Sequence, residues 1–297
     1  RRRGADGHPG RGFATLSLMA DQRSLSSPPP ARERRSISLS GVSRRRAAGL
    51  SAAQLLALGL WPGALRAADA TEAGSFRFVV INDVHYRDER CGAWLENIFR
   101  QIKSAPNPPD LCLMAGDYSE NGTRAELGAA RDAFKLLGVP VFGVVGNHDF
   151  AANDERGAYD EIFPRQLNYR FEQHGWQFLA LDSTQGRRGS GTSIPAATLQ
   201  WLDDMVPKLD ARRPTVLLTH FPLGALTPAR PLNADALLER LKPLNLQAVF
   251  NGHFHGFTER RFADAVLTTN CCCSAWRANH DLSKEKGWFL CEARDGR

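Results

Sequence analysis

The 297-residue sequence predicts one α/β domain that begins near residue 71 and is built around buried, largely parallel strands. Short apolar runs alternate with longer segments whose apolar residues recur at helical spacing, and this alternation is typical of parallel sheets covered by helices. No internal repeat and no change of composition divides the chain after Phe76. We therefore expect residues 71–297 to form a single domain.

The predicted strands are short, predominantly apolar runs, as expected for strands buried on both faces. Six of them, each bounded by turn or polar residues, cover residues 76–81, 111–115, 141–145, 176–181, 216–219 and 248–250. The helical patterns between them cover residues 94–103, 125–137, 196–209 and 234–241. In open sheets of this kind, ligands bind beyond the carboxyl ends of the strands.

The last part of the chain has a different pattern. Residues 257–262, 265–269 and 288–292 are strand-like, and no helical pattern separates the first two. A meander of this kind would extend a second sheet.

The basic charge of the chain is concentrated near its N-terminus. Residues 1–67 hold 12 of the 38 basic side chains but only 3 of the 32 acidic ones, so the remainder carries a net charge of −3. Binding to a phosphate backbone needs a basic face on the folded domain. The composition therefore gives no reason to expect nucleic-acid binding, and residues 1–42 are expected to form a disordered basic extension.

Residues 43–70 have the organisation of an export signal peptide. The arginines of Ser43-Arg44-Arg45-Arg46 precede an apolar stretch at 47–60, a Pro-Gly breaker and a zone of small residues. The arginines resemble a twin-arginine signal, although ordinary secretion and a basic tail without a targeting role are alternatives. The apolar stretch is shorter than the roughly 20 residues of a membrane span, so we expect a periplasmic or secreted protein without a stable span.

Five short polar motifs contain five of the eight histidines, and each follows an apolar run. In chain order they are Asp83-Val84-His85, Gly116-Asp117, Gly146-Asn147-His148-Asp149, Thr219-His220 and Gly252-His253-Phe254-His255. An isolated Asp-x-His or Gly-Asp arises often by chance, and a lone histidine is usually a hydrogen-bonded core or surface residue. Five motifs at predicted strand ends instead indicate one site.

The residue types in these motifs indicate a pair of divalent cations. Zn²⁺, Fe²⁺ and Mn²⁺ accept imidazole nitrogen as well as carboxylate and amide oxygen. A carboxylate can bridge two cations, and Asp117 lies centrally in the series. Cations roughly 3.5–4 Å apart can clamp a phosphoryl group, and water shared between them would lose a proton near neutral pH and become the nucleophile.

The motifs and their order resemble those of the calcineurin-like metallophosphoesterases, over about residues 76–292. The resemblance implies a four-layer αββα sandwich of two mixed β-sheets flanked by helices, with the metal site at the C-terminal ends of strands. Purple acid phosphatases carry a tyrosine ligand three residues after the bridging aspartate, where this sequence has Glu120. The chain is more similar to the compact bacterial branch that includes the class III cyclic nucleotide phosphodiesterases.

The resemblance also implies roles for individual residues. Asp83, His85 and His255 would hold one metal, Asn147, His220 and His253 the other, and Asp117 would bridge them. His148 would stabilise or protonate the leaving oxygen. Asp149 would orient the His148 imidazole through its other nitrogen.

The expected activity is hydrolysis of phosphomonoesters or phosphodiesters with two divalent ions, which could be Mn, Fe or Zn. The substrate is expected to be a small phosphate ester. The sequence identifies neither which ester it is nor the oligomeric state. The alternative is an exported metal-binding or interaction protein that keeps the ligand set with little turnover. Candidate phosphate-binding residues are Arg124, Arg187, Arg188 and Arg277, although for each of them a solvated surface arginine is the favoured interpretation.

The six cysteines, and the histidines at 174 and 280, fit none of the motifs. Cys112 lies in an apolar run and is expected in the core, and the run 271–273 is expected at a buried strand end or in a local disulfide. His174 is expected to be structural or exposed. His280, in a predicted loop, could line the substrate cleft.

Overall fold

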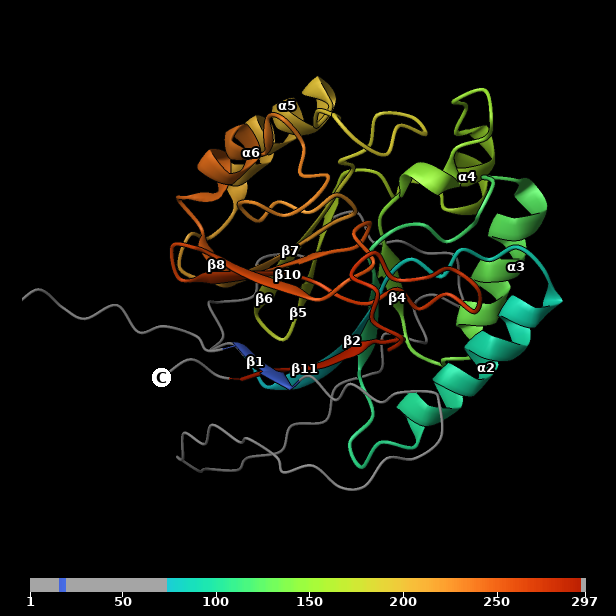
Figure 1. The fold of residues 1–297 in the computed structure, drawn as a ribbon. Helices are drawn as coiled ribbons and strands as arrows, with labels where there is room; N and C mark the ends of the chain where they lie inside the picture. Colours follow the sequence, from blue (N-terminus) through green and yellow to red (C-terminus); the bar gives the residue numbers. More distant parts are fainter. Residues whose placement is uncertain (1–15, 20–73, 295–297) are drawn as a thin grey trace, which may run out of the picture.

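Two mixed β-sheets pack face to face in the computed structural model, which describes residues 16–19 and 74–294 (Figure 1). The strand order in the first sheet is β1-β11-β2-β3-β4, and in the second it is β5-β6-β7-β8-β10-β9. The second sheet has a parallel centre with an antiparallel strand at each edge, whereas the first combines three parallel strands with antiparallel pairing on one side only. This arrangement confirms the predicted fold class.

The first sheet has three parallel strands followed in space by two antiparallel ones. Its members are β1 (Leu16–Met19), β2 (Phe76–Ile81), β3 (Leu111–Met114), β4 (Val141–Gly143) and β11 (Phe289–Ala293). Strands β2, β3 and β4 run parallel, and β11 pairs antiparallel with β2 on one side and with β1 on the other. The C-terminal strand thus lies beside the strand that begins the domain.

The second sheet has four parallel strands at its centre. Its members are β5 (Tyr169–Gln173), β6 (Trp176–Leu181), β7 (Pro214–Thr219), β8 (Asn245–Asn251), β9 (Thr258–Phe262) and β10 (Ala265–Thr269). Strands β6, β7, β8 and β10 are parallel, whereas β5 and β9 pair antiparallel at the two edges. The β9–β10 hairpin extends the second sheet, as the sequence predicts.

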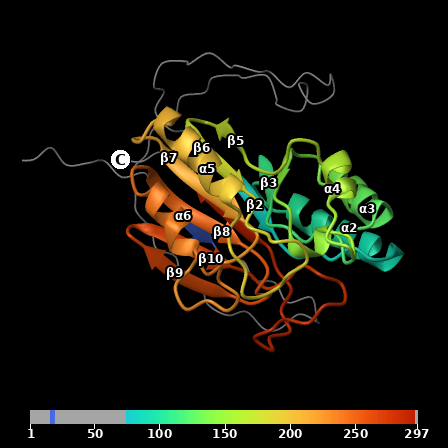
Figure 2. The ribbon, with the colours of Figure 1, turned by 90° about the horizontal axis from the view of Figure 1, so that it is seen from above.

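Helices cover both outer faces of the sandwich (Figure 2). The first sheet is covered by α2 (Glu89–Lys103), α3 (Arg124–Lys135) and α4 (Gly157–Ile162), and the second by α5 (Ala196–Met205) and α6 (Ala234–Leu241). Short 3-10 turns cover Asn147–Asp149 and Val206–Lys208. The Asp88 carboxylate accepts from the Arg90 amide and caps α2, which extends the helix to the N-terminal side of its predicted start at residue 94.

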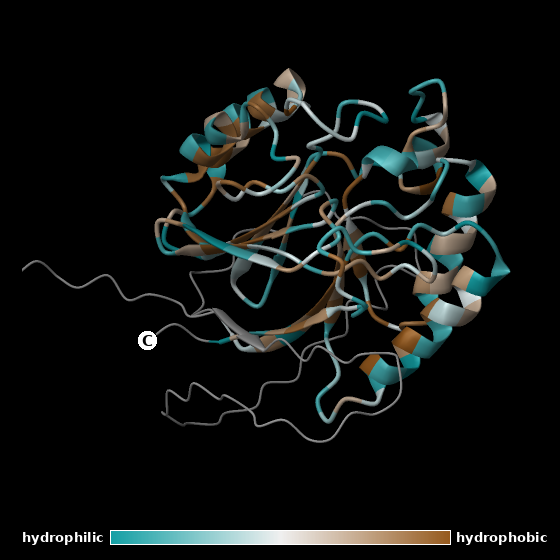
Figure 3. Cartoon of the chain, in the orientation of Figure 1, coloured by the Kyte–Doolittle hydropathy of each residue, from teal (hydrophilic) through white to brown (hydrophobic). Residues whose placement is uncertain are grey.

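Three apolar layers hold the sheets and helices together. Along β2, Phe78 and Val80 face the second sheet, whereas Val79 and Ile81 face the helices, because successive side chains of a strand point to opposite faces. The third layer lies between the second sheet and α5 and α6. Apolar residues accordingly fill the interior, and polar residues lie on the outward faces of the helices (Figure 3).

Two features of the sheets differ from the expectation or were not predicted. The predicted last strand forms as β11 but joins the first sheet rather than the second, so the C-terminal strands are not one meander. Strand β5 was not predicted. It is an edge strand of five residues with only partly buried side chains, which gives a weak apolar pattern.

Of the N-terminal extension, the structure describes Leu16–Met19, which forms β1. The remaining residues assigned to the disordered extension, and all of the predicted signal peptide at 43–70, lie outside the described residues. Within the described part of the chain, no helix is long and apolar enough to span a membrane.

The parallel strands present their carboxyl ends to one end of the sandwich. Asp83 follows β2, Asp117 follows β3, Asn147 follows β4, His220 follows β7 and His253 follows β8. Backbone hydrogen bonds join these ends, from the Asp83 amide to the Gly116 carbonyl and from the Gly252 amide to the His220 carbonyl. The fold therefore gathers the polar motifs from both sheets in one place.

Candidate metal centre

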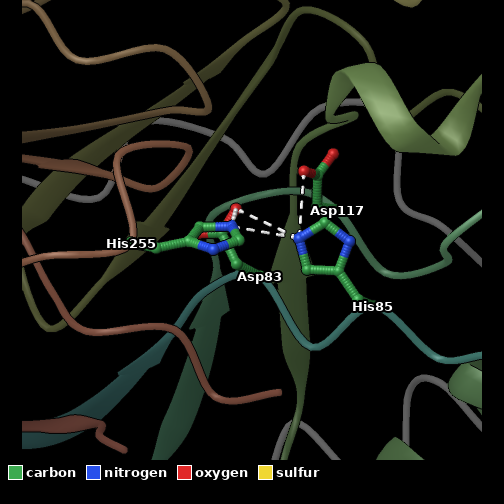
Figure 4. A group of neighbouring side chains, drawn as sticks. All are labelled: Asp83, His85, Asp117 and His255. Atoms are coloured by element: carbon green, nitrogen blue, oxygen red, sulfur yellow. Dashed lines mark hydrogen bonds and ion pairs between the residues drawn. The ribbon is translucent and has the colours of Figure 1, made fainter. Parts of the chain in front are cut away.

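All seven predicted ligand residues converge in two overlapping groups. Asp83, His85, Asp117 and His255 form one group with ligand atoms within 4.8 Å of one another, and the Asp117, His220 and His253 atoms meet the same limit in the other. Figure 4 shows the first group, with the two imidazoles and two carboxylates directed at a common point. Asp117 belongs to both groups, as its predicted bridging position requires.

In the first group, the atoms that could bind a metal come from three loops and lie close together. His255 Nε2 lies 3.0 Å from His85 Nε2 and 3.2 Å from Asp83 Oδ1. Asp117 Oδ2 lies 3.5 Å from His85 Nε2. Ligands held about 2.0–2.2 Å from one ion are themselves separated by roughly 3.0–3.5 Å, so these spacings fit a single cation.

In the second group, an amide oxygen completes the donor set. Asn147 Oδ1 lies 3.1 Å from His220 Nε2 and 3.0 Å from His253 Nδ1. Asp117 Oδ1, the other oxygen of the shared carboxylate, lies 3.4 Å from His220 Nε2. The Asn147 amide group donates to the Arg187 carbonyl at 3.3 Å, which directs its oxygen into the cluster.

The histidines use their outward nitrogens as donors. His220 Nδ1 donates to the Ala115 carbonyl at 2.9 Å, His253 Nε2 to the Gly189 carbonyl at 2.8 Å and His255 Nδ1 to the Ala278 carbonyl at 3.3 Å. His85 Nδ1 lies 2.9 Å from the Glu120 carboxylate. A carbonyl or carboxylate only accepts, so in the neutral rings the converging nitrogens carry lone pairs, which is the arrangement of metal-binding histidines.

The backbone of the ligand residues is strained. Asp83, His85, Asp117, His253 and His255 all have positive φ angles, between 46° and 65°. Residues other than glycine rarely adopt this conformation, and it persists where the surroundings impose it, commonly at functional sites. Five such residues among seven predicted ligands indicate that the fold maintains this arrangement at a conformational cost.

Two glycines let the loops approach each other. A Cβ on Gly146 would overlap the Asp117 carboxylate and backbone amide. Gly116 has a φ of 85°, and a Cβ there would lie 2.6 Å from His220 Nδ1. Larger residues at either position would displace a predicted ligand.

Burial and neighbouring charges shift the pKa values of three of the predicted ligands. Burial alone would raise the pKa of the Asp83 carboxyl, but the adjacent His255 holds it below its ordinary value. Burial alone would lower the pKa of His255, but Asp83 raises it to about 11. Burial, together with His220, lowers the pKa of His253 to about 4. Without a cation, the first group therefore retains a proton on His255 at neutral pH.

We expect divalent metal binding to release a proton and to strengthen with pH. His255 must be neutral to bind a cation, and its raised pKa means that the cation has to displace the proton. The apparent affinity should therefore rise by up to about tenfold per pH unit between about pH 6 and 8. Titration calorimetry with Mn²⁺ in buffers of different ionisation enthalpy measures the released proton, and an affinity independent of pH would contradict this prediction.

His148 lies beside the two ligand groups. Its ring lies against His85 and Glu120, and the ligand atoms of these three side chains lie within 4.8 Å of one another. Its backbone amide donates to Asp117 Oδ1 at 2.8 Å, which fixes it next to the shared carboxylate. Its Nδ1 donates to the Glu120 carbonyl at 2.9 Å. The ring is partly exposed, so its Nε2 is the nitrogen available for proton exchange.

The expected contact between Asp149 and the His148 ring does not form. The Asp149 carboxylate accepts from the Ser119 amide and the Gly146 amide, each at 2.8 Å, and the carbonyl of Glu120 takes the predicted position beside the ring. Burial, with the nearby Asp117 charge, raises the pKa of Asp149 to about 7. The buried carboxyl therefore joins the two loops that carry Asp117 and Asn147, and it does not orient the imidazole directly.

Two residues at the site were not predicted to contribute to it. Glu120 contacts both His85 and Arg277. Burial alone would raise the pKa of its carboxyl, but these two partners outweigh that effect and lower the pKa to about 2. Trp276 donates from its indole nitrogen to the His85 carbonyl at 3.0 Å. The position of Glu120, an acidic residue three residues after Asp117, could have indicated that it belongs to the site. No local sequence pattern indicates this for Trp276.

The four candidate arginines have different surroundings. Arg277 contacts Glu120 and His148, whereas Arg124 pairs with Glu161 on the surface. Arg187 donates to the Phe150 carbonyl and Arg188 to the Ser190 carbonyl. Only Arg277 among these four contacts the predicted catalytic histidine within the described structure.

The remaining candidates have mainly structural surroundings. His174 stacks on Phe76, and the exposed His280 stacks on His255 at the edge of the site, with ring centroids 4.8 Å apart. All six cysteines are buried and free, so the run 271–273, which follows β10, is a buried strand end without a disulfide.

The fold and the two ligand groups define a class of phosphoesterases, and comparison with known proteins agrees. The model of the calcineurin-like phosphoesterase family matches residues 76–257. The chain therefore belongs to this family and is a hydrolase that acts on phosphoric esters.

Relatives include proteins described as phosphodiesterases. A probable cyclic nucleotide phosphodiesterase of Synechococcus sp. is 34% identical over 200 residues, which cover 64% of this chain and 74% of the relative. A probable glycerophosphodiester phosphodiesterase of Arcobacter nitrofigilis is 29% identical over 133 residues, which cover 43% of this chain and 48% of that protein. The chain thus matches about half the length of the second relative.

A similar fold occurs in a dimetal phosphatase from Danio rerio. Its structure aligns with a TM-score of 0.52 at 15% identity, over 68% of this chain and 88% of that protein. At this identity the likeness supports the two-sheet fold alone.

Proposed function

We propose that the chain hydrolyses phosphodiesters, and in particular cyclic nucleotides, with two divalent cations. The observation that carries the proposal is a cluster of facing acceptor atoms: His85 Nε2 and His255 Nε2 in one group, and Asn147 Oδ1 between two imidazole nitrogens in the other. Acceptors brought this close repel one another unless protons or cations lie between them. The relatives described as phosphodiesterases support the choice of substrate class.

The donor set fits two ions of the borderline class. Asp83, His85 and His255 would hold one, Asn147, His220 and His253 the other, and Asp117 both. The mixture of imidazole with carboxylate and amide oxygen suits Mn²⁺, Fe²⁺ or Zn²⁺. When bound, such a pair of cations supplies charge neutralisation for phosphoryl oxygens and acidifies a water for attack on phosphorus.

The residues of the chain then perform three tasks. Asp117 and the strained loops fix the donor atoms before substrate arrives, so little reorganisation is needed during the reaction. His148 transfers a proton from Nε2 to the leaving oxygen, while the Glu120 carbonyl holds Nδ1 in its protonated form. Asp149 ties the Ser119 and Gly146 amides together behind the site.

The proposal extends to the location of the protein. The sequence of residues 43–70 supports cleavage as an export signal, with residues 71–297 as the mature domain in the periplasm or outside the cell. N-terminal sequencing of the exported product tests this part, and a product that retains Arg44 would refute it.

The activity is tested with the chain from Ala68 onward, loaded with Mn²⁺ and assayed against cyclic AMP, a linear diester and a monoester. We expect the diesters to be hydrolysed, and absence of metal-dependent turnover on every substrate would overturn the proposal. An Asn147→Ala variant removes the oxygen between His220 and His253 and should lose most of the turnover. Hydrolysis at the parental rate would refute the ligand assignment.

A further inference from the structure

The segment between β10 and β11 crosses from the second sheet to the first beside the metal centre. It contains residues 270–288 and lies outside residues 76–257, which the family model matches. Several of its contacts end on the site itself. Trp276 binds the His85 carbonyl, the Ala278 carbonyl accepts from His255, and the His280 amide donates to the His255 carbonyl.

Arg277 is the cationic side chain that this segment brings to His148. Its Nη2 lies 3.4 Å from Nδ1 and 3.5 Å from Nε2 of the His148 ring. Its Nε donates to Glu120 Oε2 at 3.1 Å, and its Nη2 donates to the other oxygen of the same carboxylate. The guanidinium is therefore held by a two-point pair beside the nitrogen that exchanges a proton with the leaving oxygen.

This pairing leaves part of the guanidinium free. An arginine has five N–H donors in a rigid fork, and Glu120 occupies Nε and one edge of Nη2. Within the described residues, Nη1 makes no hydrogen bond. The Arg277 side chain is 27% exposed, against 14% for Glu120, so the free donors remain accessible from the solvent side.

Hydrogen bonds hold the backbone of Arg277 in place. Its backbone amide donates to Ser274 Oγ at 3.1 Å, and its carbonyl accepts from the Lys286 ammonium group. The adjacent Trp276 is also held in place: its indole nitrogen donates to the His85 carbonyl, and the Arg87 guanidinium carbon lies 4.3 Å from the centroid of its ring. A surface arginine without function would not require so many fixed contacts to the loop that carries it.

We propose that Arg277 binds a phosphoryl oxygen of the substrate and that Glu120 positions it for this task. The inference rests on the proposed function and names a specificity-determining residue for the same site. A planar, partly exposed guanidinium that lies beside His148 and has N–H groups not used by Glu120 matches a tetrahedral phosphoryl group in charge and in donor geometry. Glu120 also contacts the ligand His85, so one carboxylate sets the position of a metal ligand and of the anion-binding arginine.

The charge of the substrate determines how much Arg277 contributes. A phosphomonoester carries up to two negative charges at neutral pH, whereas a phosphodiester carries one. The interaction with a fixed cation grows with the charge of the anion. Arg277 therefore favours monoesters and inorganic phosphate more than diesters, and its removal shifts the preference of the enzyme toward diesters.

Arg277→Ala tests the inference through phosphate binding as well as turnover. We expect the Kd of inorganic phosphate for the Mn²⁺-loaded protein, measured by calorimetry, to rise by about 10- to 100-fold. KM for esters should rise in parallel, more for a monoester than for a diester, while Mn²⁺ content is unchanged. Arg277→Lys should recover part of the affinity. As a matched control, Arg124→Ala removes an arginine that pairs with Glu161 at the surface and should behave like the parent.

A double variant distinguishes binding by Arg277 from release of the Glu120 charge. If phosphate affinity falls in Arg277→Ala only because Glu120 loses its partner, then Arg277→Ala combined with Glu120→Gln restores it, and the inference is overturned. Unchanged phosphate binding in Arg277→Ala overturns it as well. If the parent protein hydrolyses no ester but Arg277→Ala still weakens phosphate binding, the proposed function fails and the role of Arg277 stands.

Discussion

Asp117→Asn is expected to lose high-affinity binding of at least one divalent ion and nearly all turnover. The two oxygens of Asp117 approach His85 and His220 separately, at 3.5 Å and 3.4 Å, so this carboxylate is the one side chain shared by both ligand groups. Replacing one of these oxygens with an amide nitrogen puts a hydrogen-bond donor where one of the two groups needs an acceptor, and it removes the negative charge from both. Changes at residues that only support ligands cost about 10- to 100-fold in affinity, and a shared ligand should cost more.

The measurement is metal content by elemental analysis, with affinity by competition against a chelator. Asparagine has nearly the same size as aspartate, so the unfolding midpoint of the metal-free protein serves as the control for folding. Two equivalents of metal bound with the parental affinity would show that Asp117 does not bridge.

His148→Gln should lower kcat by about 10²- to 10⁴-fold and leave metal content unchanged. His148 is not one of the seven predicted ligands, although its ring lies close to His85 and Glu120, and a glutamine keeps its backbone bond to Asp117. A leaving oxygen that is already a good leaving group needs little protonation. The loss should therefore be smaller for an ester of a nitrophenol than for an alkyl ester.

The dependence on the leaving group separates proton transfer from general damage to the site. An equal loss of kcat for both esters would indicate that His148 only orders the loop. A fall in metal content would instead place His148 among the ligands, contrary to its contacts with the Glu120 carbonyl and Arg277.

The sequence predicts the fold well where the relevant interactions are local or strongly apolar. Strands β2 and β6 are apolar apart from one polar residue each, as expected for strands that are buried on both faces. Strand β5 alternates between partly buried and exposed residues for only five positions, which is too short a signal. The sheet in which β11 lies depends on pairing with β2, about 210 residues earlier in the chain, and no local pattern encodes that choice.

The same distinction applies to the site. The convergence of the motif residues could be predicted because each lies within a few residues of a strand end, and parallel strands bring those ends together. The contact between Glu120 and Arg277 spans 157 residues and could not. Asp149 was assigned the wrong partner because backbone amides of its own turn and of Ser119 satisfy its carboxylate more directly than the imidazole does.

The connection from β10 to β11 has a consequence for how this enzyme could change. Each of its ends is fixed by a strand, one in each sheet, and residues 271–274 at its start are buried in the core. The ligands for metal come mostly from the loops after the parallel strands, whereas Trp276 and Arg277 come from this connection. The proposed metal ligands and the proposed phosphate-binding arginine thus come from different parts of the chain, and a graft of residues 274–287 between relatives has to keep the contacts of this segment with His85 and His255.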